Sequence, residues 1–145
     1  MDESSPIKRI MLATDLSAIS ANAARDAIEL AREHGAQLIV MSVVDGSRLR
    51  LPGGRFLRRV DQERARIEEG AQALVRQARA AGADATFLVW EGDPAEAVLE
   101  AAAAEKVDVI VLGSHGRGRL GRMILGSISA RVTNGARCPV LVVRG

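Results

Sequence analysis

Short apolar runs recur along this chain at intervals long enough to hold a helix between them. The five runs are rich in aliphatic and β-branched residues and cover Ile7–Thr14, Gln37–Val44, Thr86–Trp90, Val107–Gly113 and Val140–Val143. Each run is nearly continuous in apolar character, which is typical of strands that are buried on both faces of a parallel sheet. The pattern therefore predicts five buried strands with helices on both sides of the sheet.

The segments between these runs carry apolar residues at the spacing of an amphipathic helix. The predicted helices cover Ser17–His34, about Arg55–Ala81, a segment that begins after Asp93, and a last segment from near Ser127 to Gly135. Gly35 and Gly82 are placed to end the first two helices. The third has the clearest start, because Asp93 can cap it, Pro94 suits its first turn and Glu96 completes a capping box.

The alternation of strands and helices determines the fold class that we expect. Helices of crossover length between the strands imply a parallel sheet with right-handed connections. We therefore predict an α/β fold, a doubly wound three-layer sandwich with a five-stranded parallel sheet of Rossmann-like order 3-2-1-4-5, as a single domain over residues 1–145. Ligands of such sheets bind beyond the carboxyl ends of the strands where the order reverses, so the loops after strands one and four are the candidate site.

The loop after the fourth strand is rich in glycine. It reads GSHGRGRLGRMILGS from Gly113 to Ser127. Glycines let the backbone approach a ligand closely, and the helix that starts at Ser127 offers N–H groups and the positive end of its dipole, so a phosphate-binding loop is predicted. Arginines such as Arg117 add positive charge or are simply solvated. The loop lacks the Gly-Lys-Ser/Thr of a Walker A motif, and a dinucleotide fingerprint would follow the first strand instead.

The spacing of these glycines carries a family resemblance. It reads G-x2-G-x9-G-S and is met by Gly113, Gly116, Gly126 and Ser127. Together with the segments IMLATDLS, LIVMSVVD, EGDPAEAVLEAA, VDVIVLGSHGRG and CPVLVVR, it resembles the universal stress protein family across essentially the whole chain. The resemblance implies an ATP-binding member of that family.

The resemblance also implies which residues hold the nucleotide. Asp15 would lie beside the base or ribose, Val43 would offer backbone groups to the adenine edge, and the glycine loop would hold ribose and phosphates. The full implied set is Thr14, Asp15, Val43, Gly113, Ser114, Gly116, Arg117, Gly126, Ser127 and Ile128. The sequence shows no metal-ligand cluster, and any Mg²⁺ would be held mainly by the phosphates of ATP.

Three residues near these motifs have a plainer interpretation beside a functional one. Asp15 directly follows the first strand and can instead cap the first helix, a duty that Ser17 could also take. His115 lies beside the expected phosphates, but a general base needs an orienting partner that the sequence does not show, so we favour a positional role. Cys138 precedes the last strand and is expected to be a small buried apolar residue, not a redox centre.

Composition excludes several other classes of function. Of the 145 residues only Phe56, Phe87 and Trp90 are aromatic, which disfavours a platform that stacks single-stranded nucleic acid. The net charge of +2 is weak support for DNA binding. No apolar run has the length of a membrane span, and the N-terminus lacks the apolar stretch of a secretory signal, so we expect a cytoplasmic protein without a membrane partner.

These observations favour a nucleotide-gated regulatory or protective protein of the stress response, whose ATP-bound state is recognised by an unidentified protein partner. The resemblance implies a homodimer, with the apolar edge strand Val140–Val143 as its expected interface. The alternative is a slow ATPase or a nucleotidyl or phosphoryl transferase, but the sequence shows no Walker lysine, paired carboxylates or triad for such chemistry. A flavin or adenine-cofactor electron carrier is a third alternative, and the few aromatic residues make it less attractive.

Overall fold

The protein is described by a computed structural model that covers residues 6–46, 55–114 and 126–145, with residues 55–58 described for their backbone only. Its strands are β1 (Arg9–Ala13), β2 (Gln37–Val44), β3 (Asp84–Glu91), β4 (Val109–Gly113) and β5 (Val140–Val143). They form a 5-stranded parallel sheet in the order β3-β2-β1-β4-β5. The predicted strand order is therefore confirmed.

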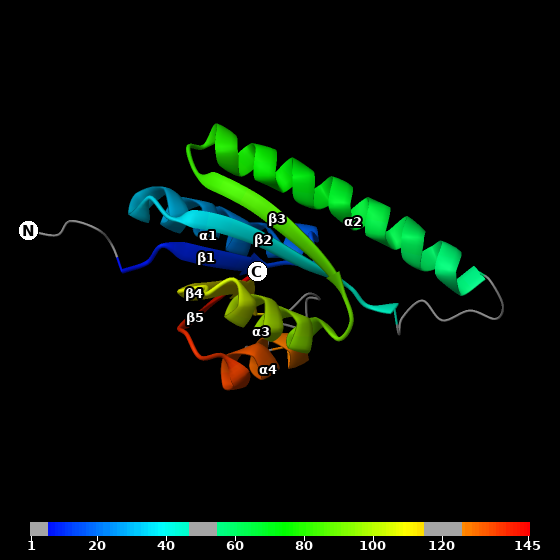
Figure 1. The fold of residues 1–145 in the computed structure, drawn as a ribbon. Coiled ribbons are helices and arrows are strands. Elements are labelled where there is room, and N and C mark those ends of the chain that lie inside the picture. The colour runs from blue at the N-terminus through cyan, green and yellow to red at the C-terminus, as the bar shows by residue number, and fades with distance from the viewer. Residues whose placement is uncertain (1–5, 47–54, 115–125) are drawn as a thin grey trace, which may run out of the picture.

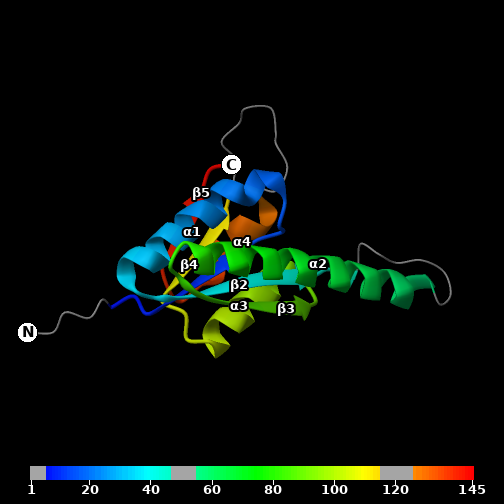
Figure 2. The same cartoon turned by 90° about the horizontal axis from the view of Figure 1, so that it is seen from above.

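The helices lie between these strands in chain order. They are α1 (Ala21–His34), α2 (Arg55–Ala80), α3 (Pro94–Ala104) and α4 (Ser127–Gly135), and a short 3-10 helix, η1 (Ala18–Ser20), precedes α1. Helices α1 and α2 pack on one face of the sheet and α3 and α4 on the other (Figures 1 and 2). This arrangement confirms the predicted doubly wound α/β/α sandwich.

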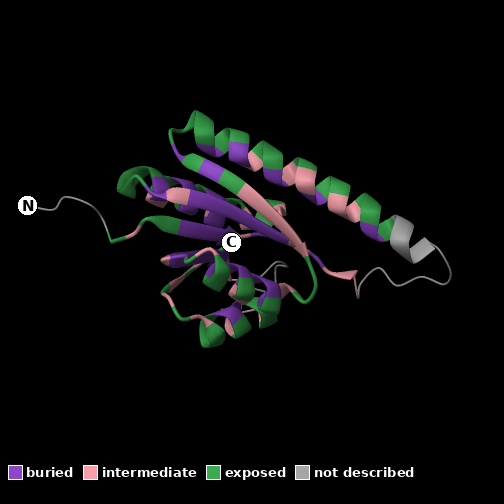
Figure 3. Ribbon diagram, viewed as in Figure 1, coloured by how far each residue is buried: buried purple, intermediate pink, exposed green. Residues whose placement is uncertain are grey.

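Alternate residues of the central strands are buried on opposite faces of the sheet. In β1, Ile10 and Leu12 belong to the core on the α1 and α2 side, whereas Met11 between them belongs to the core on the α3 and α4 side. All three side chains are fully buried, and buried positions follow the middle of the sheet in Figure 3. Burial on both faces explains why these strands appear in the sequence as continuous apolar runs.

Strand ends differ from the sequence prediction at three places. β1 is shorter than predicted at both ends, and β4 begins at Val109. At the start of these two strands, the carboxylate of Asp108 accepts the N–H groups of Lys8 and Arg9 at 2.8 and 2.9 Å. β3 is longer than the predicted Thr86–Trp90 because it pairs with β2 over its whole length.

Helix ends follow the predicted caps, with two corrections. α1 ends at Gly35, whose φ of 61° is the left-handed conformation of a helix cap. The first predicted helix is divided into η1 and α1, because Ser20 has a non-helical backbone at φ −83° and ψ 3°. At the start of α3, Asp93 accepts the N–H of Glu96 at 3.0 Å as predicted. Within the described part of the chain, the return bond that would complete the capping box does not form, and Asp93 pairs instead with Arg131 of α4.

The pair between Asp93 and Arg131 joins the two helices on one face of the sheet. Both guanidinium NH2 nitrogens of Arg131 donate to the carboxylate, one to each oxygen, at 3.1 and 2.9 Å. These bonds, with the N–H of Glu96, hold the pKa of Asp93 below its usual value. The negative form of Asp93 is thus favoured in the folded state.

We expect this pair to stabilise the fold only while Asp93 is ionised. Since its pKa is lowered on folding, the stabilisation is present above the unfolded pKa of about 3.9 and is lost as pH falls through the folded value. Asp93→Asn keeps a capping side chain but loses the charge, so its melting temperature should lie slightly below that of wild type near pH 7, and the difference should shrink as pH falls below about 3.9. Thermal unfolding followed by circular dichroism checks this, and a pH-independent difference would contradict it.

Candidate functional site

The chain leaves the two central strands toward opposite faces of the sheet. β1 leads into α1 on one face, whereas β4 precedes α4 on the other. Ala13 pairs with Leu112, so Thr14 and Gly113 follow at neighbouring positions of the same sheet edge. This edge is the place where strand order reverses, which is the usual ligand position in open α/β sheets.

The loop after β1 is a hydrogen-bonded turn. The side chain of Thr14 is buried, and its Oγ1 accepts the N–H of Leu16 at 2.9 Å and lies 3.0 Å from the Ser20 hydroxyl. Asp15 is exposed, and its Oδ1 accepts the N–H of Ser17 at 2.9 Å. Ser20 is the N-cap residue of α1, so neither Asp15 nor Ser17 caps that helix. Asp15 instead holds the turn and keeps its carboxylate at the sheet edge.

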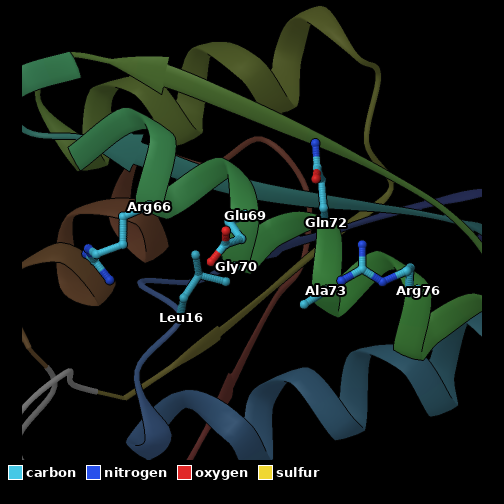
Figure 4. Close-up of a pocket in the computed structure, with 7 residues that line it drawn as sticks. All are labelled: Leu16, Arg66, Glu69, Gly70, Gln72, Ala73 and Arg76. Carbon is cyan, nitrogen blue, oxygen red and sulfur yellow. The ribbon is translucent and has the colours of Figure 1, made fainter. Parts of the chain in front are cut away.

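Leu16 has an unusual backbone conformation in this turn. Its φ is 65°, a left-handed value that costs an L-residue with a β-carbon on the order of 1–2 kcal/mol. Its side chain reaches from the turn to Gly70 of α2, at a surface groove also lined by Glu69 and Arg66 (Figure 4). Backbone strain of this kind is concentrated at functional sites.

Ser17, next in the turn, has a second unusual feature. Its hydroxyl is shielded from solvent and has no hydrogen-bond partner in the described part of the chain. A buried hydroxyl without a partner is costly, and native proteins rarely keep one without a reason.

The end of β2 presents backbone groups to the same edge. The carbonyl of Met41 accepts the N–H of Thr14 at 3.0 Å, so the backbone groups of Met41 point toward β1. Because this direction alternates along a strand, Val43 also points to that side, beyond the last residue of β1. Val44 points the other way, where its carbonyl accepts the N–H of Gly92 at 3.1 Å. The side chain of Val43 packs with the core under α3 and α4.

The two ends of the glycine segment are joined to each other and to β5. The N–H of Ser114 donates to the carbonyl of Val143 at 2.9 Å, and its own carbonyl accepts the N–H of Gly126 at 2.7 Å. The buried hydroxyl of Ser129 lies 2.8 Å from the same carbonyl and 3.0 Å from that of Gly126. These contacts fix the start of α4 beside the end of β4.

The sequence analysis did not single out Ser129. The one signal was its place in the first turn of the last helix, where a serine hydroxyl can reach nearby backbone carbonyls.

The first turn of α4 has no side-chain cap. Its N-cap residue is Gly126, and no acidic residue lies in the first turn. The N–H groups of this turn therefore lack a capping side chain, and the positive end of the helix dipole faces outward. Ser127 and Ile128 are exposed at this end of the helix. Such a helix start can bind an anion such as a phosphate.

Most of the predicted site residues lie along this one edge. Those described are at the ends of β1, β2 and β4 and the start of α4, namely Thr14, Asp15, Val43, Gly113, Ser114, Gly126, Ser127 and Ile128. Gly116, Arg117 and His115 lie outside the described residues.

Two further observations concern metals and redox chemistry. Within the described ranges, no group of three or more His, Cys, Asp or Glu side chains is arranged to hold a metal ion. Cys138 is half-buried against the core under α3 and α4, and burial raises the pKa of its thiol, so it resembles the small apolar residue expected from the sequence.

None of the described helices combines the length and the apolar character that crossing a bilayer requires.

Comparison with known proteins finds relatives along nearly the whole chain. The model of the universal stress protein family matches residues 6–144. A universal stress protein of Methanocaldococcus jannaschii is 37% identical over 141 residues, which are 94% of this chain and 82% of the relative.

Solved structures show the same similarity. The universal stress protein UspA from Lactobacillus plantarum superposes with a TM-score of 0.87 at 25% identity, covering 97% of this chain and 100% of that one. A universal stress protein solved in complex with cAMP superposes with a TM-score of 0.74 at 26% identity, covering 97% and 98%.

The Ser129 contacts predict a measurable effect on stability. Ser129→Ala removes a buried hydroxyl that bonds the base of the loop, so the free energy of unfolding should fall by about 1 kcal/mol. Ser127→Ala is the matched control, because that hydroxyl is exposed, and its change should stay within about 0.5 kcal/mol. Urea denaturation of both variants measures the difference. Equal effects of the two substitutions would show that the Ser129 hydroxyl does not hold the start of α4.

Proposed function

This chain belongs to the universal stress protein family, and on that premise we propose that it is a cytoplasmic, ATP-binding regulatory or protective protein of the stress response. We take residues 1–145 as one nucleotide-binding domain. The observation that carries the proposal is the uncapped start of α4, which Ser114 and Ser129 hold beside the end of β4. A structural relative was solved in complex with cAMP, which supports an adenine nucleotide as the ligand.

The start of α4 is suited to the phosphates. Its first-turn N–H groups and its dipole favour a negative group, and the exposed hydroxyl of Ser127 can donate to a phosphate oxygen. In the proposal, Gly113 and Gly116 let the loop approach the phosphates, Arg117 adds positive charge and Ile128 packs beside the ligand. Mg²⁺, where present, is held by the phosphates themselves.

The ends of β1 and β2 are suited to the nucleoside. Asp15 has an exposed carboxylate that can accept hydrogen bonds from ribose hydroxyls. The backbone of Val43 offers one donor and one acceptor beyond the end of β1, which suits the edge of adenine. The distance from β2 across β1 to β4 is two strand spacings, or roughly 10 Å. The order base, ribose, phosphate along ATP thus follows the strand order.

A charge substitution at the start of α4 tests the phosphate site. Ser127→Asp places a carboxylate where helix N-termini favour one, so the fold should be retained, but the added charge should repel the phosphates and weaken ATP binding by at least about tenfold. Asn134→Asp introduces the same charge at an exposed position near the other end of α4 and should bind as wild type does. Calorimetric titration with Mg-ATP measures both.

Further arms of the same experiment separate the possible outcomes. Titration with AMP and cAMP shows how much the triphosphate contributes to the affinity, and phosphate release shows whether ATP is hydrolysed. Wild-type protein that binds none of these nucleotides would contradict the proposal. Unchanged ATP affinity in Ser127→Asp would contradict the proposal that the phosphates bind at the start of α4.

We also propose that the protein forms a homodimer through β5. This strand pairs only with β4 in the described sheet, so its other edge presents free backbone groups. Leu141 on this strand is 42% exposed, which is unusual for a large apolar side chain in a sheet. A second copy of β5 would cover both features.

A charge on β5 should therefore break the dimer. Leu141→Glu places a carboxylate in the proposed apolar contact, so the protein should become monomeric while keeping its fold. Thr86→Glu is the matched control, because Thr86 is exposed on β3 at the opposite edge of the sheet. Light scattering coupled to size-exclusion chromatography gives the mass of each. A monomeric wild type, or a dimeric Leu141→Glu, would contradict this interface.

A further inference from the structure

Gly70 lies in the interior of α2, where glycine weakens a helix. Its φ is not among the positive values found in the described residues, so the backbone conformation does not require glycine. A β-carbon at this position would lie 2.9 Å from Leu16 Cδ1, so the end of the leucine side chain would have to shift, and 3.7 and 3.8 Å from Leu16 Cγ and Cβ. Gly70 thus forms a notch in α2 that receives the side chain of Leu16.

Leu16 needs this support because of its backbone. A left-handed φ at a leucine persists only when the surroundings restrain it. The N–H bond from Leu16 to Thr14 is one restraint, and the packing of the half-buried side chain is the other. That packing joins a small cluster formed by Val44, Val60 and Ile67, away from the two main cores.

The contact reaches the proposed site through the neighbours of Leu16. Asp15 precedes it, and Ser17 follows it with its N–H bonded to the Asp15 carboxylate. If Leu16 left the notch, its φ could relax and both neighbours would rotate with the backbone. Figure 4 shows Leu16 directed from the turn onto α2 at Gly70, with Glu69 alongside.

We propose that Gly70 and Leu16 are positioning residues for the nucleotide, through which α2 holds the turn that carries Asp15 and Ser17. This inference rests on the proposed function, since it concerns the same site. It adds that the affinity for the nucleoside end of ATP depends on a residue of α2, although the proposed nucleotide contacts include no residue of α2.

Gly70→Leu tests this proposal by filling the notch. Leucine is a strong helix former, so α2 should be retained, but its β-carbon would lie too close to Leu16 Cδ1 and its larger side chain would fill the notch, so Leu16 and the turn should shift. Gln77→Leu is the matched control, because it adds the same side chain at an exposed position of α2. Two readouts are compared: calorimetric affinity for Mg-ATP, and hydrogen exchange of the Leu16 and Ser17 amides without nucleotide.

In Gly70→Leu both amides should exchange faster, because they lose their bonds to Thr14 and Asp15, and ATP affinity should fall by about tenfold. Gln77→Leu should match wild type in both readouts. Unchanged exchange in Gly70→Leu would overturn the positioning role, as would faster exchange with unchanged ATP affinity. If wild type itself binds no ATP, the proposed function fails, and amide exchange still decides whether α2 holds the turn.

A second variant keeps the proposal testable if Gly70→Leu does not fold. Leu16→Ala removes the side chain that fills the notch and leaves α2 untouched, so it should reproduce the faster exchange and weaker binding. Slow exchange of the Ser17 amide in Leu16→Ala would overturn the proposal, since the turn would then hold its shape without the contact.

Discussion

The structure depends on the burial of β1 between two strands and two layers of helices. A parallel sheet covered on both faces needs helical crossovers, and their common handedness sends the chain from β1 to one face and from β4 to the other. No crossover helix then passes over the carboxyl ends of these neighbouring strands. The backbone groups and loops at that edge remain available to a ligand, so the candidate site follows from the way the core is covered.

Polar residues inside the described part of the chain gather under this edge. Those buried as whole residues are Thr14, Ser42 and Ser129, and the hydroxyl of each is hydrogen-bonded, unlike that of the partly exposed Ser17. Ser42 donates to the carbonyl of Thr14 at 2.8 Å and so ties β2 to the turn after β1, while Ser129 ties α4 to the end of β4. Satisfied buried hydroxyls restrict a backbone to one geometry. These short buried side chains thus fix the turn after β1 and the start of α4.

The sequence predicted the sheet, the strand order and the caps Gly35 and Asp93, because burial on two faces leaves apolar runs and a φ near +60° favours glycine. It did not predict Ser20 as the N-cap of α1. Contacts between distant segments could not be predicted in this way. The extent of β3 depends on its pairing with β2, and the division of the first helix at Ser20 lies in a sequence that otherwise favours a helix. Gly70 in α2 is explained only by Leu16, which lies far from it in the sequence.

The turn after β1 combines two features that folding alone disfavours. A glycine at position 16 would adopt φ 65° without strain, and a residue without a hydroxyl at position 17 would leave no buried donor unsatisfied. The strained backbone of Leu16 and the unsatisfied hydroxyl of Ser17 both lie close to the exposed Asp15 in the chain. Proteins retain such local conflicts where a function offsets them. A ligand contact at the exposed Asp15 would offset such costs, which is the physical reason for proposing the nucleoside site at this turn.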